Sequence, residues 1–291
     1  MRFVTFILGS EELPGVLSAD GTRVHPLTGW SRLIDFIADY DKKGRGIAQK
    51  LSQKGGGIPL GDVTLEAPIP HPPHDIICVG LNYAAHAMES AKASGQEYKA
   101  PERPVYFIKR VNRATPPGGD IPSHSSITQH LDYEVELAVI IGKRCRNVKP
   151  QDAFSHIFGY TVSNDISARN IQYDGIQWSF GKSLDGAAPI GPWIVTIDEF
   201  ESPPALRVTS KVNGEIRQDS NTSDFIFGIP YLISELSHGI TLEPGDIIMT
   251  GTPSGVGMGF DPPKFLRDGD VVELEIENIG VLRNTVRDVC V

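Results

Sequence analysis

Two glutamates one residue apart, Glu134 and Glu136, interrupt an otherwise apolar stretch that runs from Leu131 to Ile141. Alternate side chains of a β-strand point to the same face, so these carboxylates share one side, with Cα atoms roughly 6 to 7 Å apart. Buried carboxylates at this separation repel each other, which favours a bound cation, and oxygen ligands favour Mg²⁺, Mn²⁺ or Ca²⁺ over Zn²⁺. The pattern fits equally well a half-exposed strand whose solvent face carries Asp132 and both glutamates.

A histidine and a glutamate three residues apart, His86 and Glu89, lie in a segment with a helical pattern that follows a predicted buried strand. On a helix this spacing brings imidazole and carboxylate together, as in a general base that a glutamate orients. An ordinary surface pair has the same spacing, and the pattern alone favours that simpler interpretation. Asn82 is the predicted N-cap of the helix.

Three further features could bind a ligand. Asp165 stands between a predicted strand and a helix start, where a carboxylate either caps the helix or binds a metal ion. Lys182 lies in a loop with glycines, where its ammonium meets an anion or stays in solvent. The glycine-rich segment 250–259 follows a strand and could hold an oxyanion with backbone N–H groups. It lacks the spacing of a P-loop or a dinucleotide-binding loop, and no G-x-S-x-G elbow occurs, so an NTPase, a dehydrogenase and an ordinary serine hydrolase are disfavoured.

The composition predicts a soluble protein. The 291 residues carry a net charge of −9 and no cluster of lysines and arginines, which argues against a nucleic-acid partner. No apolar run reaches the roughly 18 residues that cross a membrane, and the apolar N-terminus is too short for a signal peptide. Cys78, Cys145 and Cys290 are far apart, so neither a disulfide framework nor a zinc ribbon is predicted. We therefore expect a cytoplasmic protein, or a mitochondrial one.

The first 68 residues predict a small α/β domain and a linker. Strand-like runs at 3–8 and 15–24 precede a helical pattern at 31–54, which two glycines near residue 45 divide in two. A stretch rich in glycine and proline follows, which is typical of a linker or an extended arm.

Residues 69–291 predict a larger domain with many short strands and few helices. An Asn-Gly pair at 213–214 marks a tight hairpin turn. The predicted fold class is therefore α+β, mainly β, with helices inserted between the strands.

Five ordered motifs resemble the fumarylacetoacetate hydrolase family over about residues 75 to 288. They are C-V-G-L-N-Y at 78–83 with His86, D-Y-E-V-E-L at 132–137, G-Y-T-V-S-N-D-I-S-A-R at 159–169, G-K-S at 181–183, and L-E-P-G-D-I-I-M-T-G-T-P at 242–253. The resemblance implies a mixed β-roll with inserted helices, as in the shorter members of the family. It also implies a homodimer.

The resemblance implies roles for particular residues. The positions matching Glu134, Glu136 and Asp165 hold a divalent metal ion, Mg²⁺ or Mn²⁺, with Ca²⁺ as a substitute in crystals. His86 and Glu89 match a pair on a lid helix that activates water. The positions that match contacts with the bound 2-oxo acid, among which Lys182 is also catalytic, are Arg169, Gln172, Lys182, Gly251 and Thr252.

The implied function is metal-dependent cleavage of a C–C bond in a 2-oxo or 2,4-dioxo acid, of the acylpyruvate hydrolase type. A metal ion that binds the carboxylate and the 2-oxo oxygen stabilises the enolate that leaves. Oxaloacetate decarboxylation is an alternative, because it needs the metal ion but no nucleophilic water. Isomerisation of an unsaturated 2-oxo acid and a catalytically silent, metal-binding member are further alternatives. The His86–Glu89 pair favours hydrolysis.

Overall fold

The computed structural model describes residues 1–288, so Cys290 lies outside the described residues. The strands are β1 (Arg2–Leu8), β2 (Glu11–Leu17), β3 (Arg23–Pro26), β4 (Ile58–Pro59), β5 (Thr64–Leu65), β6 (Ile76–Gly80), β7 (Val105–Lys109), β8 (Asp120–Pro122), β9 (Leu131–Asp132), β10 (Val135–Ile141), β11 (Ile157–Asn164), β12 (Ser167–Ala168), β13 (Ile190–Thr196), β14 (Arg207–Val212), β15 (Glu215–Asn221), β16 (Ile247–Met249), β17 (Val271–Ile276) and β18 (Gly280–Arg287). The α-helices are α1 (Leu33–Asp39), α2 (Arg45–Ser52), α3 (Ala84–Ala93), α4 (Arg169–Tyr173), α5 (Ser179–Lys182) and α6 (Ile229–Gly239). Short helical turns are η1 (Tyr40–Gly44), η2 (Leu60–Asp62), η3 (Pro150–His156), η4 (Ile197–Glu199), η5 (Thr222–Asp224) and η6 (Gly257–Gly259).

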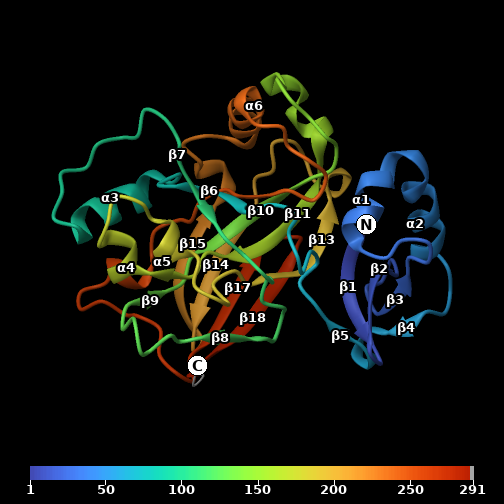
Figure 1. The fold of residues 1–291 in the computed structure, drawn as a ribbon, viewed down its shortest axis with the longest axis horizontal. Helices are drawn as coiled ribbons and strands as arrows, with labels where there is room; N and C mark the ends of the chain where they lie inside the picture. Colours follow the sequence, from blue (N-terminus) through green and yellow to red (C-terminus); the bar gives the residue numbers. More distant parts are fainter. Residues whose placement is uncertain (289–291) are drawn as a thin grey trace.

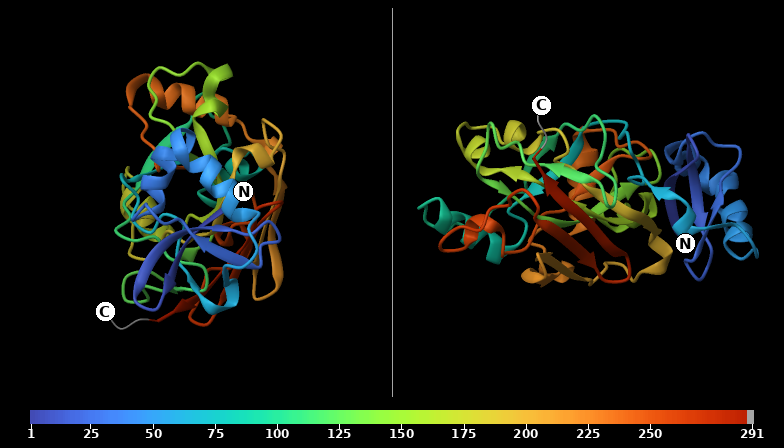
Figure 2. Two further views of the ribbon diagram at one scale, coloured as in Figure 1. Left: turned by 90° about the vertical axis from the view of Figure 1, so that its right-hand side faces the viewer. Right: turned by 90° about the horizontal axis from the view of Figure 1, so that it is seen from below.

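The larger sheet runs through the whole molecule in the order β4-β3-β2-β1-β13-β11-β10-β16-β6-β7. Its neighbours are antiparallel except for β16 and β6, which are parallel. The N-terminal strands form a lobe at one end of the molecule (Figure 1; Figure 2), and β1 joins this lobe to β13 through the pair Phe3↔Ile194. Strands from both sides of residue 68 therefore share one sheet. The domain boundary at this residue stays a prediction.

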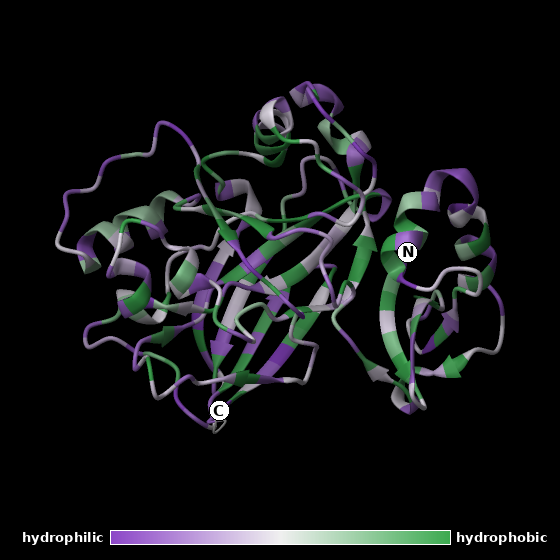
Figure 3. Ribbon diagram, viewed as in Figure 1, coloured by the Kyte–Doolittle hydropathy of each residue, from purple (hydrophilic) through white to green (hydrophobic). Residues whose placement is uncertain are grey.

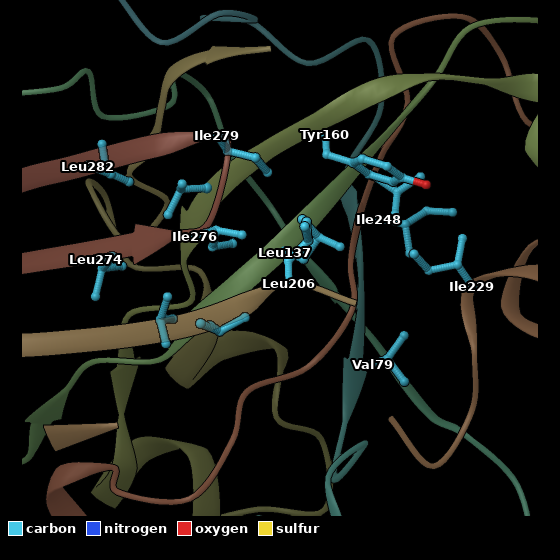
Figure 4. Close-up of a cluster of buried hydrophobic side chains, with 14 of the residues drawn as sticks. Val79, Leu137, Tyr160, Leu206, Ile229, Ile248, Leu274, Ile276, Ile279 and Leu282 are labelled. Carbon is cyan, nitrogen blue, oxygen red and sulfur yellow. The ribbon is translucent and has the colours of Figure 1, made fainter. Parts of the chain in front are cut away.

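A second sheet, in the order β15-β14-β17-β18-β8, packs against one face of the larger sheet. Its strands alternate between buried and more exposed residues, as expected for a sheet with one face in the core. Figure 4 shows side chains from both sheets meeting in this core, among them Leu137, Leu274 and Leu282. Burial of this apolar surface is the main force that holds the two sheets together.

Strand β10 is buried on both faces, which explains its long apolar run. Its residues at 135, 137, 139 and 141 face the second sheet, whereas Ala138 and Ile140 belong to a separate core with the N-terminal lobe. Glu136 shares the parity of Ala138 and Ile140, so it lies on the face away from the second sheet. In Figure 3 the central strands are mainly hydrophobic and the surrounding loops are more polar.

The N-terminal helix is not broken in two. The chain stays helical from α1 through the π-helical turn η1 into α2. A Cβ at Gly44 would lie 3.0 Å from the ring of Phe36, so the glycine allows close packing instead of a break. Phe3 then links the helix to β11, because its ring centroid lies 5.1 Å from that of Phe36 and 5.3 Å from that of Phe158.

The predicted fold class, α+β with a majority of strands, is confirmed. Within residues 1–288, none of the helices has the length and apolar character that crossing a membrane requires. Cys78 and Cys145 are buried free thiols.

Candidate metal centre and active site

Three carboxylates converge at one end of the central strand pair. Strands β10 and β11 are antiparallel, so the start of β10 lies beside the end of β11. The backbone N–H of Asp165 donates to the carbonyl of Glu134 at 2.9 Å, which closes this corner. Carboxylate oxygens of Glu134, Glu136 and Asp165 lie within 4.8 Å of one another, and all three side chains are buried. The interpretation of these glutamates as a solvent-exposed strand face is therefore wrong.

Three cationic side chains surround two of these carboxylates. The ammonium of Lys182 lies 2.8 Å from Oε2 of Glu134 and 2.7 Å from Oδ2 of Asp165. Arg169 Nη1 lies 2.6 Å from Oε1 of Glu134, and Lys109 Nζ lies 2.9 Å from Oδ1 of Asp165. Lys182 is only 2% exposed, so it is not a solvated loop lysine. Burial alone would lower the pKa of Lys182, but the two carboxylates outweigh it and raise the pKa.

The two glutamates differ in electrostatic environment. Burial would raise the pKa of Glu134, but the charges of Lys182 and Arg169 prevail and lower it. For Glu136, burial and the negative charges of Asp165 and Glu134 together raise the pKa well above its usual value. Glu136 accepts a hydrogen bond from the N–H of Gly251 at 2.7 Å. In the described part of the chain, it forms no salt bridge.

The cluster fits a hard divalent cation. With Asp132, which pairs with Arg169, four buried carboxylates face three cationic side chains, so one negative charge is in excess. The excess lies at Glu136, the carboxylate without a cationic partner among residues 1–288. Carboxylate oxygens have two lone pairs each, so those that contact lysine or arginine can still coordinate an ion. The donor set is all oxygen, as Mg²⁺, Mn²⁺ and Ca²⁺ prefer, and the choice among these ions stays a prediction.

The predicted catalytic pair lies on α3 and is buried. Nδ1 of His86 is 3.1 Å from Oε2 of Glu89, and His86 is 5% exposed, so the interpretation as an ordinary surface pair is wrong. Helices α3, α4 and α5 gather at the end of the molecule opposite the N-terminal lobe (Figure 1). The predicted N-cap is also wrong: α3 begins at Ala84 with Tyr83 as N-cap. Asn82 instead bonds to backbone groups of residues 227 and 250.

His86 of the predicted catalytic pair and two carboxylates of the acidic cluster line one small cavity. Its space for the centre of a water molecule is about 10 Å³, so it is narrow. The predicted site residues on its wall are His86, Glu134, Glu136, Arg169, Gln172, Lys182 and Thr252. Glu89 and Asp165 lie behind this wall and contact His86 and Lys182.

The glycine-rich segment holds carboxylates of the protein itself. The N–H of Gly251 donates to Glu136, and the N–H of Gly255 donates to Glu89. The N–H groups of residues 257 and 258 both donate to Asp132. The prediction that this segment holds a ligand oxyanion is therefore wrong for these four N–H groups, because carboxylates of the protein already accept their hydrogen bonds. A contact between Gly251 and substrate stays a prediction. The hydrogen bond from the N–H of Gly251 to Glu136 does not support it.

Two residues of the site are missed by the sequence reasoning. Lys109 is fully buried, and besides Asp165 its ammonium contacts the carbonyls of Ile166, Lys182 and Ala187. A lysine at the end of an apolar strand was the available signal. Asp132 binds Nε of Arg169 at 2.9 Å and orders the glycine-rich segment, although the pattern suggested a solvent position.

These features define a class of protein. The β-rich scaffold holds a small cavity in which His86 of α3 faces a buried acidic cluster. This arrangement is that of an enzyme that acts on a small molecule away from bulk water.

Comparisons with known proteins identify the family. The family described as fumarylacetoacetate (FAA) hydrolase C-terminal matches residues 75–287. The chain is 44% identical over 292 aligned positions to the oxaloacetate tautomerase YisK of Bacillus subtilis, covering 98% of this chain and 96% of the relative. The chain belongs to the fumarylacetoacetate hydrolase family, as the five motifs predicted.

Solved structures agree with this assignment along the whole chain. A fumarylacetoacetate hydrolase from psychrophilic Exiguobacterium antarcticum has a TM-score of 0.80 and 37% identity, covering 99% of this chain and 100% of that one. A maleylpyruvate hydrolase from Sphingobium sp. SYK-6 has a TM-score of 0.78 and 31% identity, with the same coverage.

Proposed function

We propose that this protein catalyses the keto–enol tautomerisation of oxaloacetate or a similarly short 2-oxo dicarboxylic acid. The observation that carries the proposal is the cavity of about 10 Å³ that His86 shares with the acidic cluster. The likeness to a protein named oxaloacetate tautomerase supports it. This reaction was not among those predicted from the sequence, which favoured hydrolysis.

The residues of the site provide the proton transfers and the charge. A divalent ion held by Glu134, Glu136 and Asp165 would polarise the 2-oxo group and stabilise negative charge on its oxygen. Because Nδ1 of His86 bonds to the carboxylate of Glu89, Nε2 is the nitrogen with a free lone pair. Nε2 takes a proton from C3 of the keto acid as a C2–C3 double bond forms, and the same Nε2–H then gives the proton to the 2-oxo oxygen, which returns His86 to its neutral form. The reverse sequence returns the keto form.

Other side chains orient the substrate and exclude water. The positively charged Lys182 and Arg169 both line the cavity and favour a dianionic acid. Phe107, Tyr173 and Trp178 form an apolar wall that leaves little space for a long acyl chain. Since the cavity has room for about one water molecule, we propose that α3 or the segment 174–178 after α4 moves when a substrate binds.

C–C cleavage of an acylpyruvate is the second candidate. The His86–Glu89 pair also suits activation of a water molecule for attack on a carbonyl carbon. The likeness to a maleylpyruvate hydrolase supports this candidate. Decarboxylation of oxaloacetate, like acylpyruvate cleavage, leaves the enolate of pyruvate, whereas tautomerisation keeps all four carbons of oxaloacetate. All three reactions must therefore be measured together.

The test compares these reactions in one preparation with Mg²⁺. The disappearance of enol-oxaloacetate is followed by its ultraviolet absorbance, and pyruvate formed from oxaloacetate or acetylpyruvate is measured with lactate dehydrogenase. We expect enol loss to be much faster than either release of pyruvate, and to fall at least about 100-fold in His86→Ala. His238→Ala, which changes an exposed histidine of α6, is the matched control and should retain full activity. Rapid acetylpyruvate cleavage without tautomerisation would establish the second candidate instead.

A further inference from the structure

A buried glutamine of the second sheet, Gln218 in β15, connects the metal centre to the wall of the cavity. Its side chain is 0% exposed. Oε1 accepts from the backbone N–H of Val135 at 3.2 Å and from Oγ of Ser210 at 3.0 Å. Nε2 donates to Oγ1 of Thr252 at 2.7 Å and to the carbonyl of Pro253 at 2.8 Å. All four hydrogen-bonding positions of the amide are therefore used.

The partners of Gln218 determine how its amide is oriented. The backbone N–H of Val135 can only donate, and the carbonyl of Pro253 can only accept, so Oε1 and Nε2 cannot be exchanged. Both hydrogens of Nε2 are then committed, one to Pro253 and one to Thr252. Thr252 Oγ1 is consequently an acceptor towards Gln218.

The hydroxyl proton of Thr252 remains available. Within residues 1–288, this hydroxyl donates to no protein acceptor, although Thr252 is buried. Thr252 lines the same cavity as Glu136 and Lys182. A hydroxyl whose lone pair is engaged by an amide N–H can direct its proton towards an anion in the cavity.

We propose that Gln218 is a positioning residue that makes Thr252 a hydrogen-bond donor to the carboxylate of the bound 2-oxo acid. The inference rests on the proposed function and on the predicted contact between Thr252 and the acid, and it adds the residue that orients this hydroxyl. Val135, whose backbone N–H donates to Gln218, lies between Glu134 and Glu136 in the chain. The side-chain amide of Gln218 therefore fixes the position of the Thr252 hydroxyl relative to the predicted metal ligands Glu134 and Glu136.

The first test changes Thr252 and uses oxalate with Mg²⁺ as the probe, with affinity measured by calorimetry. Thr252→Val retains the shape but removes the proton, and we expect it to weaken oxalate binding by about 10-fold or more. Thr252→Ser retains the hydroxyl and should stay within about threefold of the wild type. Equal affinity in the valine and serine variants would overturn the proposal, and this comparison holds even if variants at position 218 do not fold.

The second test changes Gln218→Glu, which keeps an acceptor for Val135 but replaces the donor to Thr252 by an acceptor. The hydroxyl proton then turns towards position 218. We expect oxalate affinity to fall and KM for oxaloacetate to rise by about 10-fold, with Mn²⁺ affinity and kcat within about threefold. In a Thr252→Val background the same change should have an additional effect below about twofold.

The outcomes separate this inference from the proposed function. Wild-type affinity for oxalate in Gln218→Glu, or an equal loss in both backgrounds, would overturn the positioning role alone. A wild-type protein that binds no oxalate in the presence of Mg²⁺ would overturn the proposed function, and this inference with it.

Discussion

The carboxylate of Glu89 ties the lid helix to the glycine-rich segment, because Oε1 of Glu89 accepts the backbone N–H of Gly255 at 2.9 Å. The other oxygen of the same carboxylate lies 3.1 Å from Nδ1 of His86. One side chain thus orients the proposed base and holds α3 against the segment that contains Thr252. The position of α3 against this segment and the orientation of the imidazole are therefore coupled.

Gly259→Ala tests this coupling. A Cβ at Gly259 would lie 2.1 Å from Oε1 of Glu89, whose flexible side chain would move and release His86. We expect kcat for tautomerisation to fall about 100-fold, with Mn²⁺ affinity unchanged, because only the base is misplaced. Gly239→Ala is the matched control, since a Cβ there meets no atom within 4 Å. Equal kcat in both variants would contradict the coupling.

Lys109→Met tests how far the buried cation supports the fold. Its removal leaves Oδ1 of Asp165 and three carbonyl groups without their shared partner. Breaking a buried ion pair should lower the free energy of unfolding by about 3 to 5 kcal/mol, measured by urea denaturation. Lys143→Met removes an exposed pair with Asp41 and should cost less than about 1 kcal/mol. Similar losses in the two variants would show that Lys109 has no special structural role.

His74→Gln tests a pH-dependent contribution to stability. The hydrogen bond to Asp246, at 2.7 Å, and the negative charge of that carboxylate raise the pKa of His74. Because the folded state favours protonated His74, this pair contributes fully to the free energy of unfolding below the ordinary histidine pKa of about 6.5. The contribution is lost as the pH rises through the raised pKa of the folded state.

The wild type should therefore exceed His74→Gln in Tm near about pH 5.5 and match it near about pH 9. Because His74 is 61% exposed, the difference should correspond to less than about 1 kcal/mol. His238→Gln, at an exposed position, is the control. A difference that grows with pH would contradict the assignment.

Trp178→Ala tests the selection of short substrates. The indole packs against Gly80, where a Cβ would lie 2.5 Å from the ring, and its centroid lies 5.6 Å from that of Phe107. Removing the indole should raise kcat/KM for longer 2-oxo acids relative to oxaloacetate by about 10-fold or more. Ile176→Ala, in the same loop but 94% exposed, should leave this ratio unchanged. An unchanged ratio in Trp178→Ala would exclude the indole as the limiting wall.

Local pattern predicts part of the site. The shared face of Glu134 and Glu136 follows from the two-residue period of a strand, and the spacing of His86 and Glu89 follows from the helix. Pattern alone could not decide between burial and exposure for either pair, because burial depends on what covers them. The motifs of the family were needed to add Asp165 to the glutamates.

Tertiary contacts explain what pattern could not predict. Asp165 reaches Glu134 through the antiparallel pairing of β10 and β11, and Lys109 arrives from β7. Gln218 comes from a different sheet, and it is the one buried residue of β15, a strand without a regular alternation of burial. No local signal marks such residues, since their partners are distant in sequence.

The most direct test of the account is the rate of enol-oxaloacetate tautomerisation in the wild type and in Glu136→Gln, each with Mg²⁺ and after removal of metal by EDTA. Glu136 carries the uncompensated charge of the cluster, so its neutral isostere should weaken metal binding without loss of shape. We predict a wild-type rate that EDTA abolishes and added Mg²⁺ restores, and a rate at least about 100-fold lower in Glu136→Gln. A wild-type rate that survives EDTA, or a variant as active as the wild type, would contradict metal-assisted enolisation at this centre.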